Sequence, residues 1–446
     1  MNNKSGFKKS NWTVLLLFGL IGQIAWAVEN MYFNRFVFGT ISPDLDAITL
    51  MVQLSGVVAT VATLVAGTLS DKAGNRRSFI SWGYIIWGFT VAIFGFLSPE
   101  LIGNLFTLPP AKAISLTLVL VIAGDCVMTL FGSTANDASF NAWVTDNTNT
   151  HNRGTVEGVL SILPLVAMLI VAGGFGILVD LIGYRALFLS LGVVISLSGA
   201  AGMFLIKASP ALSPSGSMRD IFYGFRPSVV KSNLPLYITL LIILVYGIAT
   251  QIFMPYLIIY MEQYLGFSTI EYSAVFAVAI LAGAALNLYL TRLANKFDKA
   301  LLLYGGAAIY ALGLMIMYFV KDIDKVALLI LFGIGGFVMI SGNIFIMALT
   351  GALVRDYTPE GEAGKLQGVR MVFSVLIPMV VGPLVGNAIN AARNIPIPDS
   401  SSEVAMTTLY IPAPEIFLAA SLLVLAVIAL IPLLRRVRNT SSKSEI

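Results

Sequence analysis

Three carboxyl groups lie inside long apolar stretches of this 446-residue chain: Glu29, Asp125 and Asp137. A charged side chain at the centre of a bilayer costs about 2.5–3.5 kcal/mol even on the lenient insertion scale, so each acid needs a reason to be there. Such acids commonly bind a cation or line a water-filled path. The sequence therefore nominates all three as candidate binding residues.

Amides and aromatic residues accompany the first of these acids. They are Gln23, Trp26, Asn30 and Asn34. Carboxylates and amides hydrogen-bond hydroxyl groups, and aromatic faces cover the C–H surfaces of sugars, so this group predicts a hydroxyl-rich ligand. The alternative is an internal salt bridge from Glu29 to Arg35, but six residues is a poor spacing for a pair on one helix.

The other two acids share one apolar segment, with Asn136 next to Asp137. Reversible binding of H⁺ or Na⁺ by such a buried carboxyl group is a way to couple an ion to a solute. For Asp125 the alternative is a hydrogen bond to a neighbouring helix, and for Asp137 it is a packing role near Arg153. The second half offers amide, hydroxyl and basic groups instead of acids: Gln251, Tyr256, Asn343 and Arg370.

Composition excludes several functional classes. Hydrophobic residues make up 57% of the chain and charged residues 11%, which is too little charge for a soluble protein of this length. Cys126 and His151 are the only residues of their kinds, so we expect neither a disulfide nor a metal site. No Walker loop or nucleophile–base set is present, so we expect no enzyme and no cofactor beyond a coupling H⁺ or Na⁺. The expected partners are the bilayer and a small solute, without nucleic acid, and we expect a monomer.

Apolar segments long enough to cross a bilayer predict twelve spans. They are 12–36, 46–70, 78–98, 113–141, 157–180, 185–206, 233–260, 270–291, 300–320, 326–350, 366–390 and 411–434. All Lys and Arg residues except Arg35, Lys112, Arg185, Lys321, Lys325 and Arg393 fall in the termini, in the loops after even-numbered spans or, for Arg370, at the beginning of the span that follows such a loop. The positive-inside rule then predicts both termini in the cytoplasm of a cell (inner) membrane protein.

A phrase repeated 210 residues apart divides the chain into related halves. Asp146-Asn147-Thr148 is followed by Gly154 and Gly158, and Asp356-Tyr357-Thr358 by Gly364 and Gly368. Each copy sets an acid against a following base, Arg153 or Lys365, and its glycine pair predicts tight helix packing. We expect an N-terminal lobe at 1–206, a cytoplasmic linker at 207–232 and a C-terminal lobe at 233–446. A bare tether is the preferred interpretation of the linker, with an amphipathic helix at Met218–Phe225 as the alternative.

The loop after the second predicted span fits the pattern G-x-x-x-D-x-x-G-x-R-R through Gly67, Asp71, Gly74, Arg76 and Arg77. It resembles the signature loop of the major facilitator superfamily, and the topology resembles that family over nearly the whole chain. The resemblance implies an all-α membrane protein with twelve transmembrane helices in two pseudo-symmetric six-helix lobes. It also implies that the loop latches the lobes in one conformation; a simple topology anchor is the alternative.

The Asp146 loop and the segment 356–362 resemble the glycoside–pentoside–hexuronide:cation symporter branch of that superfamily. The resemblance implies cation-coupled symport of a sugar or glycoside by alternating access. Asp71, Asp146, Arg153, Asp356 and Arg370 are the expected gating and orienting residues. The competing hypotheses are proton-driven efflux of an amphipathic compound or lipid, and a membrane sensor that does not transport.

Overall fold

The computed structural model describes residues 7–148, 152–207, 218–293, 297–321, 323–359, 363–397 and 409–444, and nearly all of them are helical. Two compact units divide the chain: an N-terminal unit of Met1–Pro43 and Leu54–Met218, and a C-terminal unit of Asp44–Gln53 and Arg219–Ile446. The third helix, α3 (Leu45–Ala73), contributes its first residues to the C-terminal unit and the rest to the N-terminal unit.

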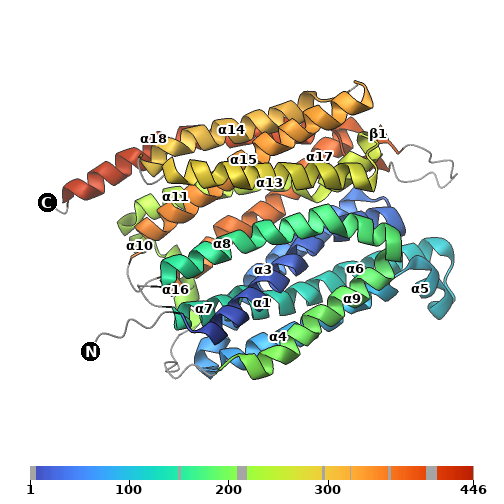
Figure 1. The fold of residues 1–446 in the computed structure, drawn as a ribbon, viewed down its shortest axis with the longest axis horizontal. Coiled ribbons are helices and arrows are strands. Elements are labelled where there is room, and N and C mark those ends of the chain that lie inside the picture. Colours follow the sequence, from blue (N-terminus) through green and yellow to red (C-terminus); the bar gives the residue numbers. More distant parts are fainter. Residues whose placement is uncertain are drawn as a thin grey trace. The chain divides into compact units, whose positions relative to one another are not determined.

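The N-terminal unit is built from long helices (Figure 1), and π-helical and 3₁₀ turns interrupt several of them. In chain order its other elements are α1 (Lys9–Val28), η1 (Glu29–Phe33), α2 (Asn34–Phe36), η2 (Val37–Ile41), α4 (Arg76–Ile93), η3 (Phe94–Phe96), α5 (Pro99–Phe106), α6 (Pro110–Gly132), η4 (Ser133–Phe140), α7 (Asn141–Asn147), α8 (Arg153–Ile170), η5 (Val171–Phe175) and α9 (Gly176–Leu205).

The C-terminal unit repeats this plan and adds a two-residue strand pair. Its elements are η6 (Met218–Phe225), α10 (Pro227–Ser232), α11 (Leu234–Phe253), η7 (Met254–Tyr256), α12 (Leu257–Ile259), η8 (Tyr260–Tyr264), α13 (Thr269–Leu293), α14 (Lys299–Phe319), α15 (Lys325–Tyr357), α16 (Ala363–Met371), η9 (Val372–Leu376), α17 (Ile377–Arg393), β1 (Ile395–Pro396), β2 (Tyr410–Ile411) and α18 (Glu415–Ser444). Strands β1 and β2 pair antiparallel.

Eleven helical runs within the described residues are long and apolar enough to cross a membrane. One of them, Gly158–Leu205, holds 48 residues, and a straight helix of that length would measure about 72 Å, more than twice the bilayer core. Gly183 breaks it with φ +75°, a conformation that glycine adopts without strain. This run therefore contains the fifth and sixth predicted spans, and the predicted fold of twelve membrane helices is confirmed.

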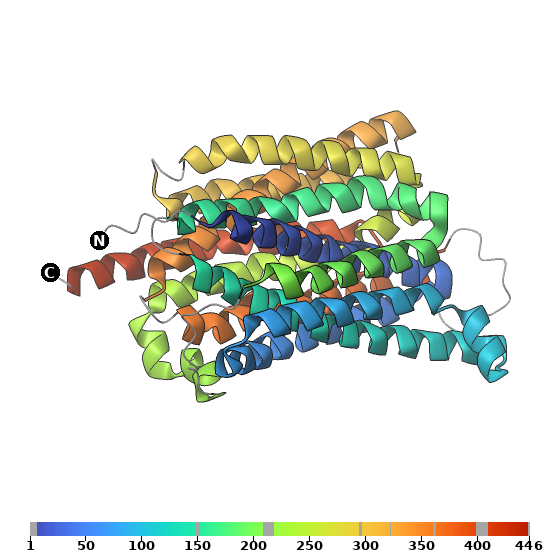
Figure 2. The same cartoon turned by 60° about the horizontal axis from the view of Figure 1, so that its bottom comes forward.

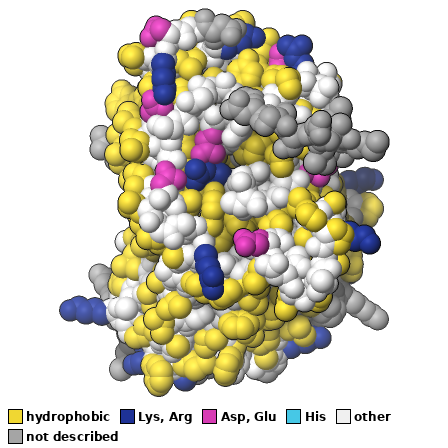
Figure 3. All heavy atoms as spheres, turned by 90° about the vertical axis from the view of Figure 1, so that its right-hand side faces the viewer, with side chains coloured by type: hydrophobic (Ala, Val, Ile, Leu, Met, Phe, Trp, Pro, Cys, Tyr) yellow, Lys and Arg dark blue, Asp and Glu magenta, His cyan; other side chains and the backbone are white. Residues whose placement is uncertain are grey.

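Apolar side chains dominate the lipid-facing surface as well as the interior. Phe204 is 85% exposed and Leu181 is 74% exposed, as expected for side chains that meet lipid rather than water. In the end-on view of Figure 3, yellow hydrophobic side chains cover much of the visible flank, and the charged side chains are few and scattered.

Small residues bring helices together within each unit, because lipid gives apolar side chains no reason to associate and close packing must do so. Gly88 of α4 faces the backbone of Gly192 in α9, and Gly313 of α14 faces the backbone of Met339 in α15. The helices of each pair consequently pack along one another (Figures 1 and 2).

The linker is not a bare tether where the structure describes it. A 3₁₀ helix occupies Met218–Phe225, the alternative that the sequence offered, and α10 follows. The hydroxyl of Tyr237 donates to the carbonyl of Gly224, and the guanidinium of Arg226 lies over the ring of Tyr223, 5.4 Å from its centroid. These contacts hold the end of the linker against the C-terminal unit.

Candidate functional site

The carboxyl group of Glu29 lies where three helical elements of the N-terminal unit meet. Its Oε1 atom is 2.9 Å from the Ser55 hydroxyl of α3 and 3.1 Å from the Thr129 hydroxyl of α6. Those two hydroxyls are 2.7 Å apart. Glu29 is only 8% exposed and begins the π-helical turn η1, a kind of distortion that often marks functional sites.

Asp125 joins this cluster from one turn earlier on α6. Only 2% of the residue is exposed, and it lies close enough to Glu29 and Ser55 to interact with both. Oδ1 of Asp125 and Oε2 of Glu29 are buried without a hydrogen-bond partner among the described residues. Unsatisfied buried carboxyl oxygens are costly, so this pair is suited to holding a cation or a proton.

Asp137 lies three turns further along the same span, in the π-helical stretch η4. Its carboxylate accepts hydrogen bonds from Ser133 at 3.0 Å and from the Asn136 amide at 3.3 Å. The Tyr84 hydroxyl of α4 lies 2.9 Å from Oδ1 of Asn136, which links the stretch to a second helix. The structure gives no contact of Asp137 with Arg153, whose side chain lies outside the described residues.

The side-chain amides next to Glu29 form hydrogen bonds with backbone carbonyls of their own helix. Asn30 donates to the Trp26 carbonyl at 2.8 Å, and Asn34 donates to the Asn30 carbonyl at 3.3 Å. Trp26 packs its ring against Trp87, with 5.1 Å between centroids, and Gln23 is half-buried. Arg35 pairs with Asp180 at 3.9 Å, so the alternative of a Glu29–Arg35 salt bridge is wrong.

The candidates of the second half fall into two places in the C-terminal unit. Asn343 of α15 donates to the Thr250 hydroxyl at 3.4 Å, and this hydroxyl lies 2.7 Å from that of Tyr310. The Tyr256 hydroxyl instead lies 2.7 Å from Thr49 and donates to the Pro383 carbonyl at 2.9 Å.

Gln251 of α11 is half-buried beside α17, where Gly382 makes room for its Cβ atom.

The hydroxyl groups that complete the clusters of both units were not identified from the sequence. They are Ser55, Thr129, Ser133, Tyr84, Thr250 and Tyr310. A four-residue spacing from Asp125 would have found Thr129 and Ser133, whereas the others come from separate helices and carry no local signal.

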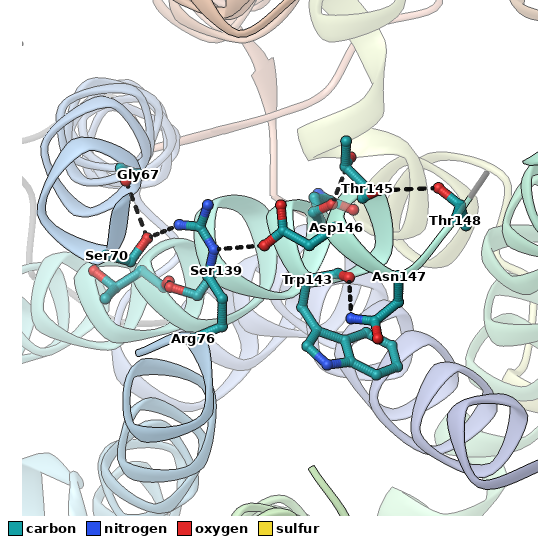
Figure 4. A network of polar contacts seen from close by, with 11 residues as sticks. Gly67, Ser70, Arg76, Ser139, Trp143, Thr145, Asp146, Asn147 and Thr148 are labelled. Atoms are coloured by element: carbon teal, nitrogen blue, oxygen red, sulfur yellow. Dashed lines mark hydrogen bonds and ion pairs between the residues drawn. The ribbon is translucent and has the colours of Figure 1, made fainter. Parts of the chain in front are cut away.

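The signature loop is organised by Arg76 (Figure 4). This residue is 6% exposed, and its guanidinium donates to the Ser70 hydroxyl at 2.5 Å and to the Asp146 carboxylate at 3.1 Å. Gly74 has φ +60°, which allows the tight turn before α4. Arg77 is exposed, and the side chain of Asp71 lies outside the described residues, so the latch remains a prediction.

One expectation about this region is corrected. A Cβ atom on Gly67 or Gly158 would meet none of the described residues within 4 Å, so neither glycine makes a tight helix contact within the N-terminal unit. Asp146 pairs with Arg76 at the start of α4. The side chain of Arg153 lies outside the described residues, so its role beside Asp146 stays a prediction.

The C-terminal unit contains the matching ion pair. Lys299 at the start of α14 lies 2.5 Å from Asp356 at the end of α15, while the predicted partner Lys365 has a side chain outside the described residues. Arg370 lies in the last turn of α16, and its orienting role stays a prediction. Each half thus joins the start of its third span to the end of its fourth.

The sequence profile of the Major Facilitator Superfamily matches residues 12–383. The chain belongs to the Major Facilitator Superfamily. A search of curated protein sequences finds no match. Membership makes this a multi-pass transport protein, and the family predicted from the Gly67–Arg77 loop is confirmed.

Solved structures with the same superfamily fold include two of the nucleoside transporter NupG. One, of a variant, has a TM-score of 0.66 and 12% identity over 94% of this chain and 99% of that one. The other has a TM-score of 0.63 and 13% identity over 95% and 99%. A bacterial homologue of the human lysosomal transporter Spinster, inward-facing and unoccupied, has a TM-score of 0.66 and 14% identity over 98% and 99%.

Replacing Gly22 with alanine is expected to disturb the hydrogen bond between Asn136 and Tyr84, next to Asp137. The new Cβ atom would lie 2.5 Å from Oδ1 of Asn136 and 2.6 Å from the Tyr84 hydroxyl, so both must move and their hydrogen bond is strained. Overpacking of this kind costs about 1–3 kcal/mol, and we expect a lower thermal unfolding midpoint in detergent. Gly158→Ala is the control, because its Cβ meets nothing within 4 Å; an equal loss in both variants would contradict the assignment.

Acidification is expected to remove the stabilising effect of the ion pair that joins α18 to the start of α14. Arg438 of α18 holds both carboxylate oxygens of Asp298, at 2.7 and 2.8 Å, and this pairing lowers the pKa of Asp298. A carboxyl group whose pKa is lowered by folding stabilises the protein at pH values above its ordinary pKa of about 3.9. This stabilisation is lost as the pH falls through the pKa that the group has in the folded protein. The difference in unfolding midpoint between the wild type and Asp298→Asn should therefore shrink below about pH 4.

Asp324→Asn is the control for this pH dependence. Asp324 caps α15 through the Val326 and Ala327 amides, and the described residues give it no arginine partner. A midpoint difference for Asp298→Asn that stays constant from neutral pH to pH values below about 4 would contradict the prediction.

Proposed function

We propose that this transporter couples uptake of a hydroxyl-rich solute, a sugar or glycoside, to the entry of H⁺ or Na⁺ by alternating access. The observation that carries the proposal is the pair of buried carboxyl groups, Glu29 and Asp125, each with an oxygen left unpartnered among the described residues. A cation bound there relieves the cost of burying two acids, so the cation and the conformation of the unit depend on each other.

The hydroxyl and amide groups of the C-terminal unit support the choice of solute. Thr250, Tyr310 and Asn343 form a neutral hydrogen-bonding cluster with no carboxylate among its contacts to the described residues, which suits hydroxyl groups better than a cation. NupG, which has the same fold, is a nucleoside transporter, and a nucleoside is itself a glycoside of a pentose. The proposed orientation has both termini in the cytoplasm of a cell membrane, as the distribution of Lys and Arg predicts.

The test is uptake by purified protein in proteoliposomes with an imposed pH gradient, a Na⁺ gradient or neither. Labelled melibiose, lactose, xylose and uridine are suitable solutes, and counterflow at equal pH and Na⁺ measures exchange without a driving ion. Accumulation of one of these solutes with either gradient supports the proposal. Exchange without ion-driven accumulation would remove the coupling, and binding without any exchange would favour a sensor.

A dye-loaded parallel preparation separates import from export. If an amphipathic dye leaves the vesicles when a pH gradient is imposed and none of the four solutes enters, the protein is an exporter and the proposed function is wrong.

A further inference from the structure

Four polar side chains form a ladder along the fourth span at intervals of four residues. They are Asp125, Thr129, Ser133 and Asp137. A four-residue step overshoots one turn of an α-helix and falls short of one turn of a π-helix. Because η4 begins at Ser133, the π-helical turns offset the drift of the α-helical ones, and the ladder stays on one face.

Each of the two hydroxyl groups in this ladder makes a hydrogen-bond contact with a carboxyl group. The Thr129 hydroxyl lies 3.1 Å from Oε1 of Glu29, and the Ser133 hydroxyl donates to Oδ2 of Asp137 at 3.0 Å. Thr129 is 1% exposed and Ser133 is fully buried, so these hydroxyls do not face lipid or bulk water. One helix turn separates them.

The second half of the chain shows that the fold does not require this ladder. The 210-residue offset that aligns the repeated phrase places Gly335, Met339, Asn343 and Met347 at the corresponding positions. The equivalent helix, α15, runs from Lys325 to Tyr357 as an uninterrupted α-helix. A span at this place in a lobe thus packs without carboxyl groups and without a π-helical stretch, and both features of the N-terminal unit need a functional explanation.

We propose that the ladder carries a proton from the Glu29/Asp125 pair to Asp137 and releases it at the Asn147 end of the span. This inference rests on the proposed function and identifies the coupling ion as H⁺. The carboxyl pair loses the proton and becomes charged, the hydroxyls of Thr129 and Ser133 each accept one proton and pass on another, and the Asp137 carboxylate becomes a carboxylic acid. Asp137 then returns to the carboxylate by giving the proton to water.

Single buried hydroxyls favour H⁺ over Na⁺. A proton needs one acceptor about 3 Å away at each step. The contacts of Glu29 with Thr129 and of Ser133 with Asp137 meet this requirement. One water molecule between the Thr129 and Ser133 hydroxyls completes the proposed path across the intervening turn by accepting one proton and passing on another. A sodium ion needs several oxygen ligands at every binding site along its path, and one hydroxyl group per turn of a packed helix does not supply them. The groups facing Asp137 from the surrounding elements are Trp26 of α1, Glu29 of η1, Tyr84 of α4, and Ser133 and Asn136 of its own stretch.

Three variants test the ladder: Asp137→Asn, Ser133→Ala and, as matched control, Ser139→Ala. Ser139 lies in the same π-helical stretch and is equally buried, but its hydroxyl donates to the Thr134 carbonyl at 2.8 Å. For the solute with the largest pH-driven uptake among melibiose, lactose, xylose and uridine, we expect the first two variants to lose at least about tenfold of that accumulation. Counterflow at equal pH should be kept by all three variants, and Ser139→Ala should accumulate like the wild type.

Asp137→Glu should restore part of the accumulation, since it returns an ionisable oxygen to the same helix face. Wild-type accumulation in Asp137→Asn and Ser133→Ala would overturn the ladder and leave the proposed function standing, and so would wild-type uptake that follows Na⁺ but not pH. A wild type that exchanges solute but accumulates it with neither gradient would overturn the proposed coupling and the ladder together.

Discussion

Replacing Glu29 with glutamine is expected to abolish ion-driven accumulation while solute exchange continues. Glutamine keeps an oxygen for the Ser55 and Thr129 hydroxyls, which lie 2.9 and 3.1 Å from Oε1, so the helix contacts survive. An amide neither takes up a proton nor neutralises a cation, and proton transfer by a positioned side chain contributes on the order of 100-fold or more. The measurement is initial uptake under a pH or Na⁺ gradient against counterflow without one.

Asp125→Asn should behave in the same way, because its carboxyl group belongs to the same pair and is 2% exposed. Glu100→Gln is the matched control, since Glu100 lies exposed in the short helix α5, outside the apolar runs. Uphill accumulation at the wild-type level in both Glu29→Gln and Asp125→Asn would refute the assignment of the coupling site.

Replacing Asp146 with alanine is expected to cause the largest loss of stability. It removes the carboxylate that lies 3.1 Å from the guanidinium of Arg76, a residue that is 6% exposed. Removing one partner of a buried ion pair costs about 3–5 kcal/mol. A lower unfolding midpoint in detergent and less protein in the membrane should follow.

The second half supplies the control for this variant. In the corresponding pair, the side chains of Lys299 and Asp356 are 31% and 49% exposed, against 7% and 22% for Arg76 and Asp146. Water and salt screen such an exposed pair, so Asp356→Ala should cost no more than about 1 kcal/mol.

A double replacement separates charge from packing. Arg76→Met with Asp146→Leu removes both charges at similar volume and should recover most of the stability lost in Asp146→Ala. If the double variant is as unstable as the single one, or if Asp356→Ala is equally damaging, buried charge is not the cause.

The two halves of the chain have diverged in chemistry while keeping one plan. The N-terminal unit holds its intramembrane acids on η1, α6 and η4, two of which are π-helical, whereas α15 in the second half is a regular α-helix with uncharged residues at the four corresponding positions. The sequence already shows this difference, because acids in an apolar segment can be read without knowing their neighbours. The proposed division of these acids between a coupling site and a proton path rests on Thr129 and Ser133, which lie on one helix face with them.

The pairings across helices show where local spacing stops being informative. Asp146 and Arg76 are seventy residues apart in the sequence, yet they form an ion pair. Ser55 reaches Glu29 for the same reason, from a helix that begins sixteen residues further along the chain. Both contacts depend on how each helix is rotated about its axis, which the packing of neighbouring helices determines.

The sequence by itself determined the spans, the two related halves, the superfamily and the three intramembrane acids. These follow from local properties, because a bilayer demands about twenty apolar residues per span and makes every charge within them conspicuous. The tertiary structure alone decided that Ser55 and Thr129 meet Glu29, that Arg76 is buried against Asp146, and that Asn30 and Asn34 bond to their own helix. Those partners come from helix packing and rotation, which depend on all the neighbouring helices at once.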